Sequence, residues 1–198
     1  MTHKILRIDS SIKSEGSISR QLSDDILARL KSSYQNAEVV TRDLGANPLP
    51  PTDAHWLGSF ATPVDERSPA QAETVALSDT LIAEIKDADT ILIGLPIYNF
   101  AAPAQLKTWL DQMARAGETF RYSETGPEGL VKNTRAIIAF SSNGTRLGSD
   151  IDFASKYVRH MLGFFGITDV QFVASDHYAI DADSSLKAAN EGVAAIAA

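Results

Sequence analysis

The chain has 198 residues, of which 44% are apolar and 22% charged, and this composition is typical of a soluble globular domain. Its net charge of -7 argues against sequence-independent binding of nucleic acid, which needs a surplus of Lys and Arg. Because there is no cysteine, disulfides, thiolate nucleophiles and Cys-ligated metal sites are excluded, and any redox chemistry requires a bound cofactor.

Short apolar runs that suit strands alternate with longer segments whose apolar residues recur at helical spacing. One helix start is marked by Ser68 at the N-cap, Pro69 in the first turn and Gln71, which completes a capping box. Residues 47–67 and 118–132 are rich in turn-forming residues and are expected to be irregular. The expected strands are residues 4–9, 38–43, 90–95, 135–140 and 169–174, and the expected helices are residues 19–33, 68–87, 103–116, 152–165 and 184–197.

This alternation predicts parallel strands joined by crossover helices. Right-handed crossovers then give a doubly wound α/β sheet of three layers, and five strands fit the flavodoxin-like order 2-1-3-4-5. No repeat or linker divides the chain, so we expect residues 1–198 to form a single domain. In such a sheet the ligand lies beyond the carboxyl ends of the strands, where the winding reverses.

No apolar run approaches the roughly 20 residues that a bilayer crossing requires. The chain also begins in a strand-like run that lacks the apolar core of a signal peptide. We therefore expect a cytoplasmic protein with no membrane span.

The loop after the first strand, residues 10–19, contains five serines and one glycine. Hydroxyls and free backbone N–H groups at a helix N-terminus form an anion site. The loop lacks both the GxxxxGK(S/T) pattern of a nucleoside-triphosphate loop and the GxGxxG pattern of a dinucleotide turn, so it suits a terminal monophosphate. The alternative is an ordinary helix cap in a polar loop.

The loops after the third and fourth strands suit a planar ring. Two aromatic residues, Tyr98 and Phe100, flank Asn99 and offer stacking and edge hydrogen bonds, unless they only pack beneath the next helix. Asn143 and Gly144 tolerate positive φ and can turn backbone N–H groups toward a ligand, unless they form only a polar turn. A monophosphate site and two ring-binding loops on one sheet edge together favour FMN over NAD or ATP.

The chain resembles the FMN-dependent NADH:quinone oxidoreductases known as azoreductases, from about residue 5 to residue 173. Several matches occur in the same order, and the resemblance departs at Ser142-Asn143 and over residues 53–67. The matching stretches are Ser10-Ser11, Ser17-Ile18-Ser19, Pro96-Ile97-Tyr98-Asn99-Phe100, Ala116-Gly117-Glu118-Thr119-Phe120-Arg121-Tyr122, Gly126-Pro127-Glu128-Gly129-Leu130 and Leu162-Gly163-Phe164-Phe165-Gly166-Ile167-Thr168-Asp169-Val170.

The resemblance implies a ping-pong enzyme that transfers two electrons from NAD(P)H through one FMN per subunit to quinones, and that cleaves azo compounds to amines. It also implies a homodimer with active sites at the subunit interface, and neither a catalytic side chain nor a metal. The implied phosphate ligands are Ser11, Ser17, Ile18 and Ser19, with Ser10 nearby. The implied ring contacts are Ile97, Tyr98, Asn99, Phe100, Ser141, Ser142, Asn143 and Gly144, and the implied acceptor pocket contains Phe120, Tyr122 and Phe164.

Three other functions fit parts of the pattern. A signalling receiver domain needs a phosphoacceptor Asp after the third strand, where this chain has Gly94-Leu95-Pro96. A serine hydrolase would pair Ser10 or Ser11 with the neighbouring Asp176 and His177. A flavodoxin-type electron carrier would bind FMN without oxidising NADH directly, and it is the main alternative to an enzyme.

Overall fold

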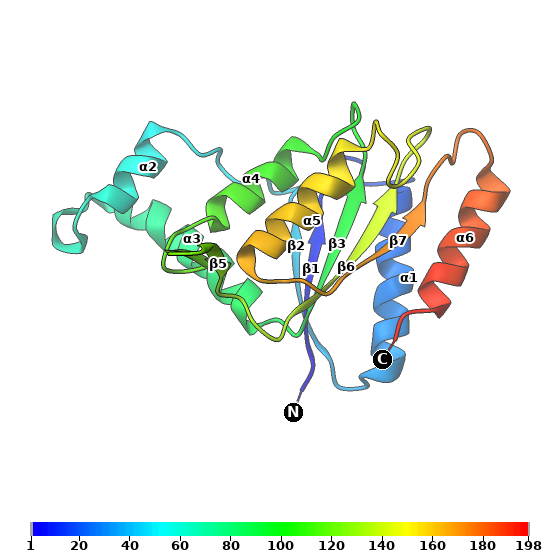
Figure 1. Ribbon diagram of the computed structural model, residues 1–198, viewed down its shortest axis with the longest axis horizontal. Coiled ribbons are helices and arrows are strands. Elements are labelled where there is room, and N and C mark those ends of the chain that lie inside the picture. Colours follow the sequence, from blue (N-terminus) through cyan, green and yellow to red (C-terminus); the bar gives the residue numbers. More distant parts are fainter. Residues whose placement is uncertain (1, 198) are drawn as a thin grey trace.

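A computed structural model describes residues 2–197 and shows a five-stranded parallel sheet with helices on both faces (Figure 1). The strands are β1 (Lys4–Asp9), β2 (Glu38–Asp43), β3 (Thr90–Pro96), β4 (Phe120–Ser123), β5 (Gly126–Gly129), β6 (Arg135–Ser141) and β7 (Val170–Ser175). The helices are α1 (Ile18–Ser33), α2 (Ala54–Ala61), α3 (Pro69–Asp87), α4 (Ala104–Met113), α5 (Phe153–Phe165) and α6 (Ala182–Ala194), with a 3-10 turn at Val64–Glu66.

The strand order in the main sheet is β2-β1-β3-β6-β7, so the central strand β3 is covered on both faces. Successive residues of β3 point to opposite sides, because side chains alternate along a strand. Ile91 and Ile93 join the core beneath α3, α4 and α5, whereas Leu92 joins the core beneath α1 and α6. This explains why β3 is apolar at nearly every position.

The predicted start of α3 is confirmed in detail. The Ser68 hydroxyl accepts the Gln71 backbone N–H, and the Gln71 side chain accepts the Ser68 N–H, which completes the capping box. The Ser17 side chain also caps α1, by accepting the Arg20 N–H, and Asp152 and Asp181 cap α5 and α6. With Asp53 at the start of α2, side-chain caps mark where five of these helices begin.

Two segments expected to be irregular contain regular structure. The segment after β2 forms α2, because the Asp53 carboxylate accepts the Trp56 N–H at 2.7 Å and caps a helix. The segment before β6 forms the antiparallel β4–β5 hairpin, which is separate from the main sheet. The expected order 2-1-3-4-5 omitted these two strands, which is why the numbering of the main sheet differs. As a separate finding, within residues 2–197 no helix is both long and apolar enough to cross a membrane.

The parallel sheet gathers three loops at one edge, the upper edge in Figure 1. These loops follow β1, β3 and β6, which are adjacent in the sheet. A Cβ atom at Gly94 would lie 3.1 Å from the Ser23 hydroxyl of α1, so a glycine here lets α1 approach β3 closely. The N-terminus of α1 is thereby brought next to the loops that follow β3 and β6.

Candidate functional site

The three loops line one pocket of about 110 Å³ at the carboxyl edge of the sheet. Hydroxyls, backbone groups and one aromatic ring share its wall, as expected for a site that takes both a phosphate and an organic group. Five of the predicted cofactor residues are outside this lining, namely Ser10, Ser19, Asn99, Phe100 and Gly144. The lining consists of Ser11, Lys13, Gly16, Ser17, Ile18, Pro96, Ile97, Tyr98, Ser141, Ser142 and Asn143.

The start of α1 presents hydroxyls and backbone donors together. The Ser17 hydroxyl accepts the Arg20 N–H at 3.4 Å and lies 3.3 Å from the Ser19 hydroxyl. Gly16, which directly precedes the N-cap Ser17, has φ +63°, a left-handed conformation that glycine adopts without strain. Ser10 behaves differently, because its buried hydroxyl donates to the Gly94 carbonyl at 2.6 Å and so joins β1 to β3.

Tyr98 connects the first two loops. Its hydroxyl lies 3.2 Å from the Ser11 hydroxyl and accepts the Ile12 N–H at 3.1 Å. The next residue back, Ile97, donates its N–H to the Ser141 carbonyl at 2.9 Å. The loop after β3 is therefore bonded to the loop after β1 on one side and to the end of β6 on the other.

The turn at Asn99 and Phe100 has a strained backbone. Tyr98 and Ala101 exchange two backbone hydrogen bonds of 3.1 Å, which closes a two-residue turn. The φ angles of Asn99 and Phe100 are +50° and +69°, in the region that favours glycine. Phe100 is nevertheless aromatic and 53% exposed, and such strain is concentrated at functional sites.

The third loop differs from the prediction. Neither Asn143 nor Gly144 has a positive φ. Their loop is held instead by the segment after β7, since Tyr178 and Ala179 donate N–H bonds of 3.1 Å to the carbonyls of Ser142 and Asn143. The Ser142 hydroxyl donates to the Thr145 carbonyl. Asn143 and Gly144 are exposed, whereas Ser141 and Ser142 are largely buried.

Two cations lie near the end of the pocket that is formed by the start of α1. Lys13 lines it directly, a residue that sequence reasoning missed although it is the one basic residue between Asp9 and Arg20. Arg20 lies behind the loop and forms an ion pair with Asp43 at 2.7 Å, which holds the pKa of Asp43 below its usual range. Burial raises the pKa of Asp9, although Arg7 lies 2.9 Å away.

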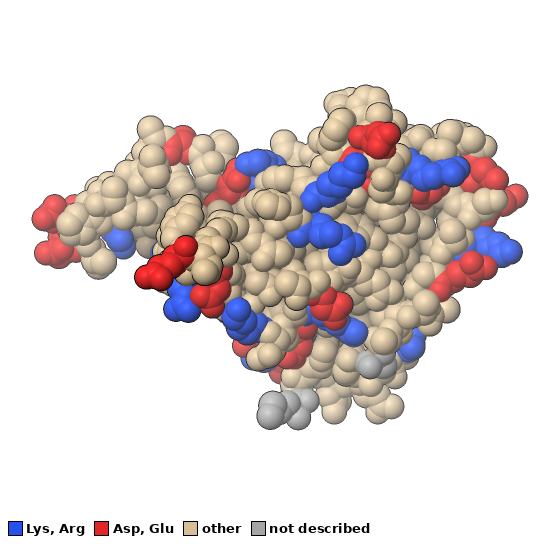
Figure 2. All heavy atoms as spheres, in the orientation of Figure 1, with Lys and Arg blue, Asp and Glu red and all other residues tan. Residues whose placement is uncertain are grey.

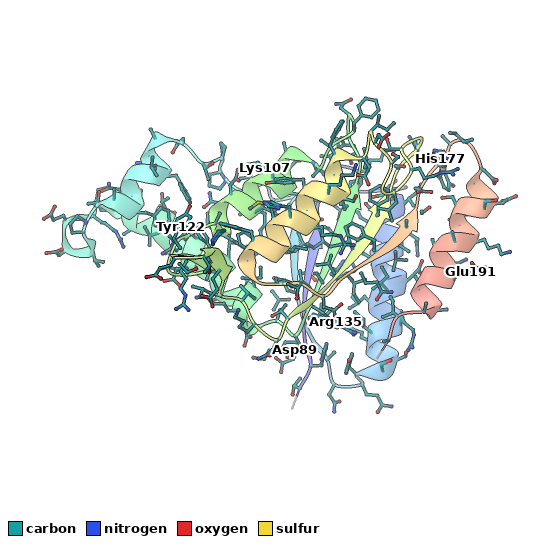
Figure 3. The ribbon with its side chains drawn as sticks, viewed as in Figure 1. Asp89, Lys107, Tyr122, Arg135, His177 and Glu191 are labelled. Atoms are coloured by element: carbon teal, nitrogen blue, oxygen red, sulfur yellow. The ribbon has the colours of Figure 1, made fainter. Side chains whose placement is uncertain are left out.

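The residues predicted to bind the acceptor form a separate aromatic cluster. The Phe120 ring lies 4.3 Å from the Phe164 ring and 5.5 Å from the Tyr122 ring, centroid to centroid. Tyr122 is 75% exposed on the β4–β5 hairpin, far from the loop that carries His177 beside the pocket (Figure 3). Within one chain, the cluster therefore does not line the same pocket as Tyr98.

The hydrolase and receiver alternatives find no support, and for a receiver domain β3 ends in Gly94-Leu95-Pro96 with no phosphoacceptor Asp. The Asp176 carboxylate accepts the Leu147 N–H at 2.6 Å, and the His177 Nδ1 atom lies 3.4 Å from an Arg146 nitrogen. The Ser10 hydroxyl is used by Gly94, so the described residues show no serine–histidine hydrogen bond at this edge. A nucleophile needs such a base within reach.

Comparisons with known proteins agree with this geometry. A family model described as having a flavodoxin-like fold matches residues 3–198. A protein of Jannaschia sp. named FMN-dependent NADH:quinone oxidoreductase 1 is 53% identical over 198 residues, covering all of both chains. A protein of Cereibacter sphaeroides named FMN-dependent NADH:quinone oxidoreductase is 52% identical and covers 98% of each chain.

Two solved structures are also similar. An azoreductase from Bacillus anthracis superposes with a TM-score of 0.86 at 28% identity, covering 98% of this chain and 96% of the other. A second B. anthracis protein, an FMN-dependent NADH-azoreductase in complex with FMN, has a TM-score of 0.88 at 26% identity, with 97% and 96% covered. The chain therefore belongs to the flavodoxin-like fold family and, within it, to the FMN-dependent NADH:quinone oxidoreductases.

Proposed function

We propose that the chain is an FMN-dependent enzyme that transfers two electrons from NADH to quinones and to aromatic azo compounds. The observation that carries this proposal is the pocket in which the start of α1, Tyr98 and the end of β6 meet. Relatives at 53% and 52% identity bear the name of this activity, and a structural neighbour was solved in complex with FMN.

The donors at one end of the pocket fit a phosphate monoester. Ser17 and Ser19 supply hydroxyls 3.3 Å apart at the N-terminus of α1, where the helix dipole favours an anion. Lys13 adds a positive charge, and Ser11 adds a third hydroxyl. We assign Ser11, Ser17, Ile18 and Ser19 to the phosphate, and we assign Ser10 to holding β1 against β3.

The other end of the pocket fits a planar ring system. Ile97 and Tyr98 would form its wall, Asn99 and Phe100 its strained rim, and Ser141, Ser142, Asn143 and Gly144 its opposite edge. When bound there, FMN supplies the redox chemistry, because it accepts a hydride equivalent and releases two electrons. Overall, NADH and one proton convert a quinone to a hydroquinone, and two NADH with two protons convert an azo compound to two amines.

The protein's own part is to hold and orient the reactants. Asn143 and Gly144 are exposed. Backbone N–H groups of these residues that faced the ring edge would stabilise negative charge there, as an oxyanion hole does. A Cβ atom at Gly144 would meet no atom within 4 Å, so this chain leaves open space at that position. NADH and the quinone or azo compound would occupy the same face of the flavin ring in turn, which gives ping-pong kinetics.

We also propose a homodimer in which each pocket is completed by the partner's aromatic cluster. The cluster of Phe120, Tyr122 and Phe164 lies apart from the pocket of its own chain, yet acceptor binding needs a second apolar wall. The face over α4 and α5 carries basic side chains set among uncharged ones (Figure 2). Phe100, Ile151 and Phe153 are exposed beside that face.

The remaining features of the proposal concern the whole chain. We propose that residues 1–198 form a single FMN-binding domain with a doubly wound sheet, because the family model spans residues 3–198. We propose a cytoplasmic location, because the proposed electron donor NADH is a cytoplasmic cofactor.

Initial-rate kinetics separates the enzyme from a flavodoxin-type electron carrier. With FMN bound, rates measured at varied NADH and quinone should give parallel double-reciprocal lines, and an azo dye should be bleached at two NADH per azo bond. A carrier would bind FMN but would oxidise NADH no faster than free FMN does. That result would overturn the proposed activity and leave the cofactor site standing.

A further inference from the structure

One arginine fastens the loop that carries the proposed phosphate donors. Arg20 lies in the first turn of α1, and its side chain is 17% exposed. Its Nε atom donates to the Lys13 carbonyl at 2.8 Å, and its Nη2 atom donates to the Ser11 carbonyl at 2.8 Å. Arg20 therefore binds two carbonyl groups of a loop whose expected ligand is an anion.

A fixed carbonyl also fixes the N–H group of the same peptide, because a planar trans peptide points the two in opposite directions. The peptide that joins Ser11 to Ile12 has its carbonyl on Arg20 and its N–H on the Tyr98 hydroxyl at 3.1 Å. Tyr98 lines the pocket together with Ser11. The bond to Arg20 therefore turns a carbonyl away from the pocket and a donor toward it.

Arg20 is itself held rigidly from the end of β2. Its Nη1 and Nη2 atoms donate to the two carboxylate oxygens of Asp43 at 2.7 Å each. Asp43 also accepts the N–H groups of Gly45 and Ala46 at 3.0 Å, so the turn after β2 fixes its orientation. A Cβ atom at Gly45 would lie 2.0 Å from the Ser11 carbonyl oxygen, which is thus confined between Gly45 and Arg20.

On the basis of the proposed FMN site, we infer that Arg20, held by Asp43, is a positioning residue that makes the loop after β1 selective for a phosphate monoester. It acts through the loop and not by contact with the phosphate. A carbonyl oxygen turned toward the site would repel the anion, and an arginine fork holds two carbonyls and a carboxylate in one geometry. The consequence is preference for FMN over riboflavin, which lacks the phosphate.

The test measures dissociation constants for FMN and riboflavin by quenching of flavin fluorescence. Arg20→Lys keeps the charge but loses the planar fork, and Asp43→Asn removes a negative charge but loses the anchor of Arg20. Positioning predicts that both variants weaken FMN binding about tenfold and leave riboflavin binding unchanged. A simple charge effect predicts unchanged FMN binding in Arg20→Lys and tighter binding in Asp43→Asn.

Arg7→Lys is the matched control. Arg7 is also largely buried and pairs with Asp9 and Asp24, but among residues 2–197 its recorded bonds reach no carbonyl of the loop. The Arg7→Lys variant should have the same ratio of FMN affinity to riboflavin affinity as the unchanged chain. An unchanged ratio in Arg20→Lys would overturn the positioning role alone, even if Asp43→Asn failed to fold. Failure of the unchanged chain to prefer FMN would overturn the proposed site and this role together.

Discussion

At the scale of single residues, the backbone at Asn99 and Phe100 points most directly to function. A left-handed conformation costs a non-glycine residue about 1 kcal/mol or more. Asn tolerates this conformation through local hydrogen bonding, but Phe has no such compensation. The ring of Phe100 is 53% exposed, so burial of the ring recovers little of that cost within the chain. A requirement for an aromatic ring at the proposed flavin site accounts for its presence.

Replacing Phe100 with glycine should therefore stabilise the fold and weaken the site. We expect Phe100→Gly to raise the free energy of unfolding by about 1 kcal/mol, because φ +69° is no longer strained. FMN affinity should fall by about tenfold as the aromatic contact is lost. Urea unfolding and FMN titration measure the two effects.

Asn133→Gly provides the control for this prediction, since Asn133 has φ +61° and lies outside the pocket lining. Asn133→Gly should change stability little, because Asn tolerates this conformation, and it should leave FMN affinity unchanged. If Phe100→Gly lowered stability and left FMN binding intact, the strain would have no connection with the site.

His3 gives a residue-scale prediction about pH. Its ring stacks on Tyr34 at 3.7 Å and its Nε2 atom lies 2.9 Å from the Thr90 hydroxyl, and burial lowers its pKa below 6.5 despite the nearby Asp89. The unfolded chain then binds more protons than the folded one as the pH falls through 6.5, so this contribution to stability is present above that pH and is lost below it.

The variant His3→Phe keeps a ring for stacking but cannot take up a proton. The urea midpoint of the unchanged chain should fall more steeply than that of His3→Phe between about pH 7.5 and pH 5.5. Equal slopes for the two proteins would show that His3 does not contribute to the acid sensitivity.

At the scale of elements, the β4–β5 hairpin is fixed to the end of α5 by close backbone contact. A Cβ atom at Gly129 would lie 2.1 Å from the Gly166 nitrogen, and Val131 donates its N–H to the Phe165 carbonyl at 2.9 Å. Gly166 ends α5 at φ +107°. Because Phe120 and Tyr122 are on the hairpin and Phe164 is on α5, this junction determines the shape of the aromatic cluster.

Gly129→Ala should therefore separate acceptor use from cofactor binding. The added methyl group overlaps backbone atoms, so we expect a loss of about 3 kcal/mol in unfolding free energy and a lower kcat/KM for quinone. FMN affinity should not change, because the pocket lies elsewhere. Denaturant titration, steady-state kinetics and FMN binding test the three parts.

Gly163→Ala is the matched control, because an added Cβ meets no atom within 4 Å at this position in α5. It should raise stability by up to about 1 kcal/mol with normal quinone turnover. A Gly129→Ala protein with normal turnover would contradict the proposed role of the junction.

Periodicity predicted the helices and strands of the main sheet because their packing obeys local rules. The capping box at Ser68 and the uniformly apolar β3 are examples. Periodicity missed α2, where the Asp53 cap starts a helix despite the surrounding prolines. It also missed the hairpin, whose strands have the sequences Phe-Arg-Tyr-Ser and Gly-Pro-Glu-Gly. Short strands of this kind depend on tertiary contact with α5, which no local pattern contains.

At the scale of the whole molecule, the proposed active site is divided between two surfaces of each chain. The cofactor loops lie at the carboxyl edge of the sheet, and the aromatic cluster lies where the β4–β5 hairpin meets the end of α5 (Figure 1). Sequence patterns singled out the three loops that line the pocket, and the family resemblance suggested the residues of the aromatic cluster. Neither gave the distance between the two surfaces, the hydroxyl bond from Ser10 to Gly94, or the loop carbonyls on Arg20, because all three depend on how distant elements pack.

Subunit complementation tests this division. One variant, Tyr98→Ala, should lose its cofactor pocket, and another, Tyr122→Ala with Phe164→Ala, should lose its acceptor wall. Random reassociation of equal amounts of the two inactive dimers should restore roughly a quarter of normal activity, because half the dimers are hybrids with one intact site. Complete absence of recovery, with hybrids shown to form, would contradict a site shared between subunits.

The most direct test of the central claim is the absorbance spectrum of the purified chain with FMN, recorded without oxygen before and after NADH. We predict about one FMN bound per chain, complete bleaching of the yellow bands by about one equivalent of NADH, and their return when a quinone is added. A chain that takes up no FMN, or one whose bound FMN keeps its colour in excess NADH, would contradict the account.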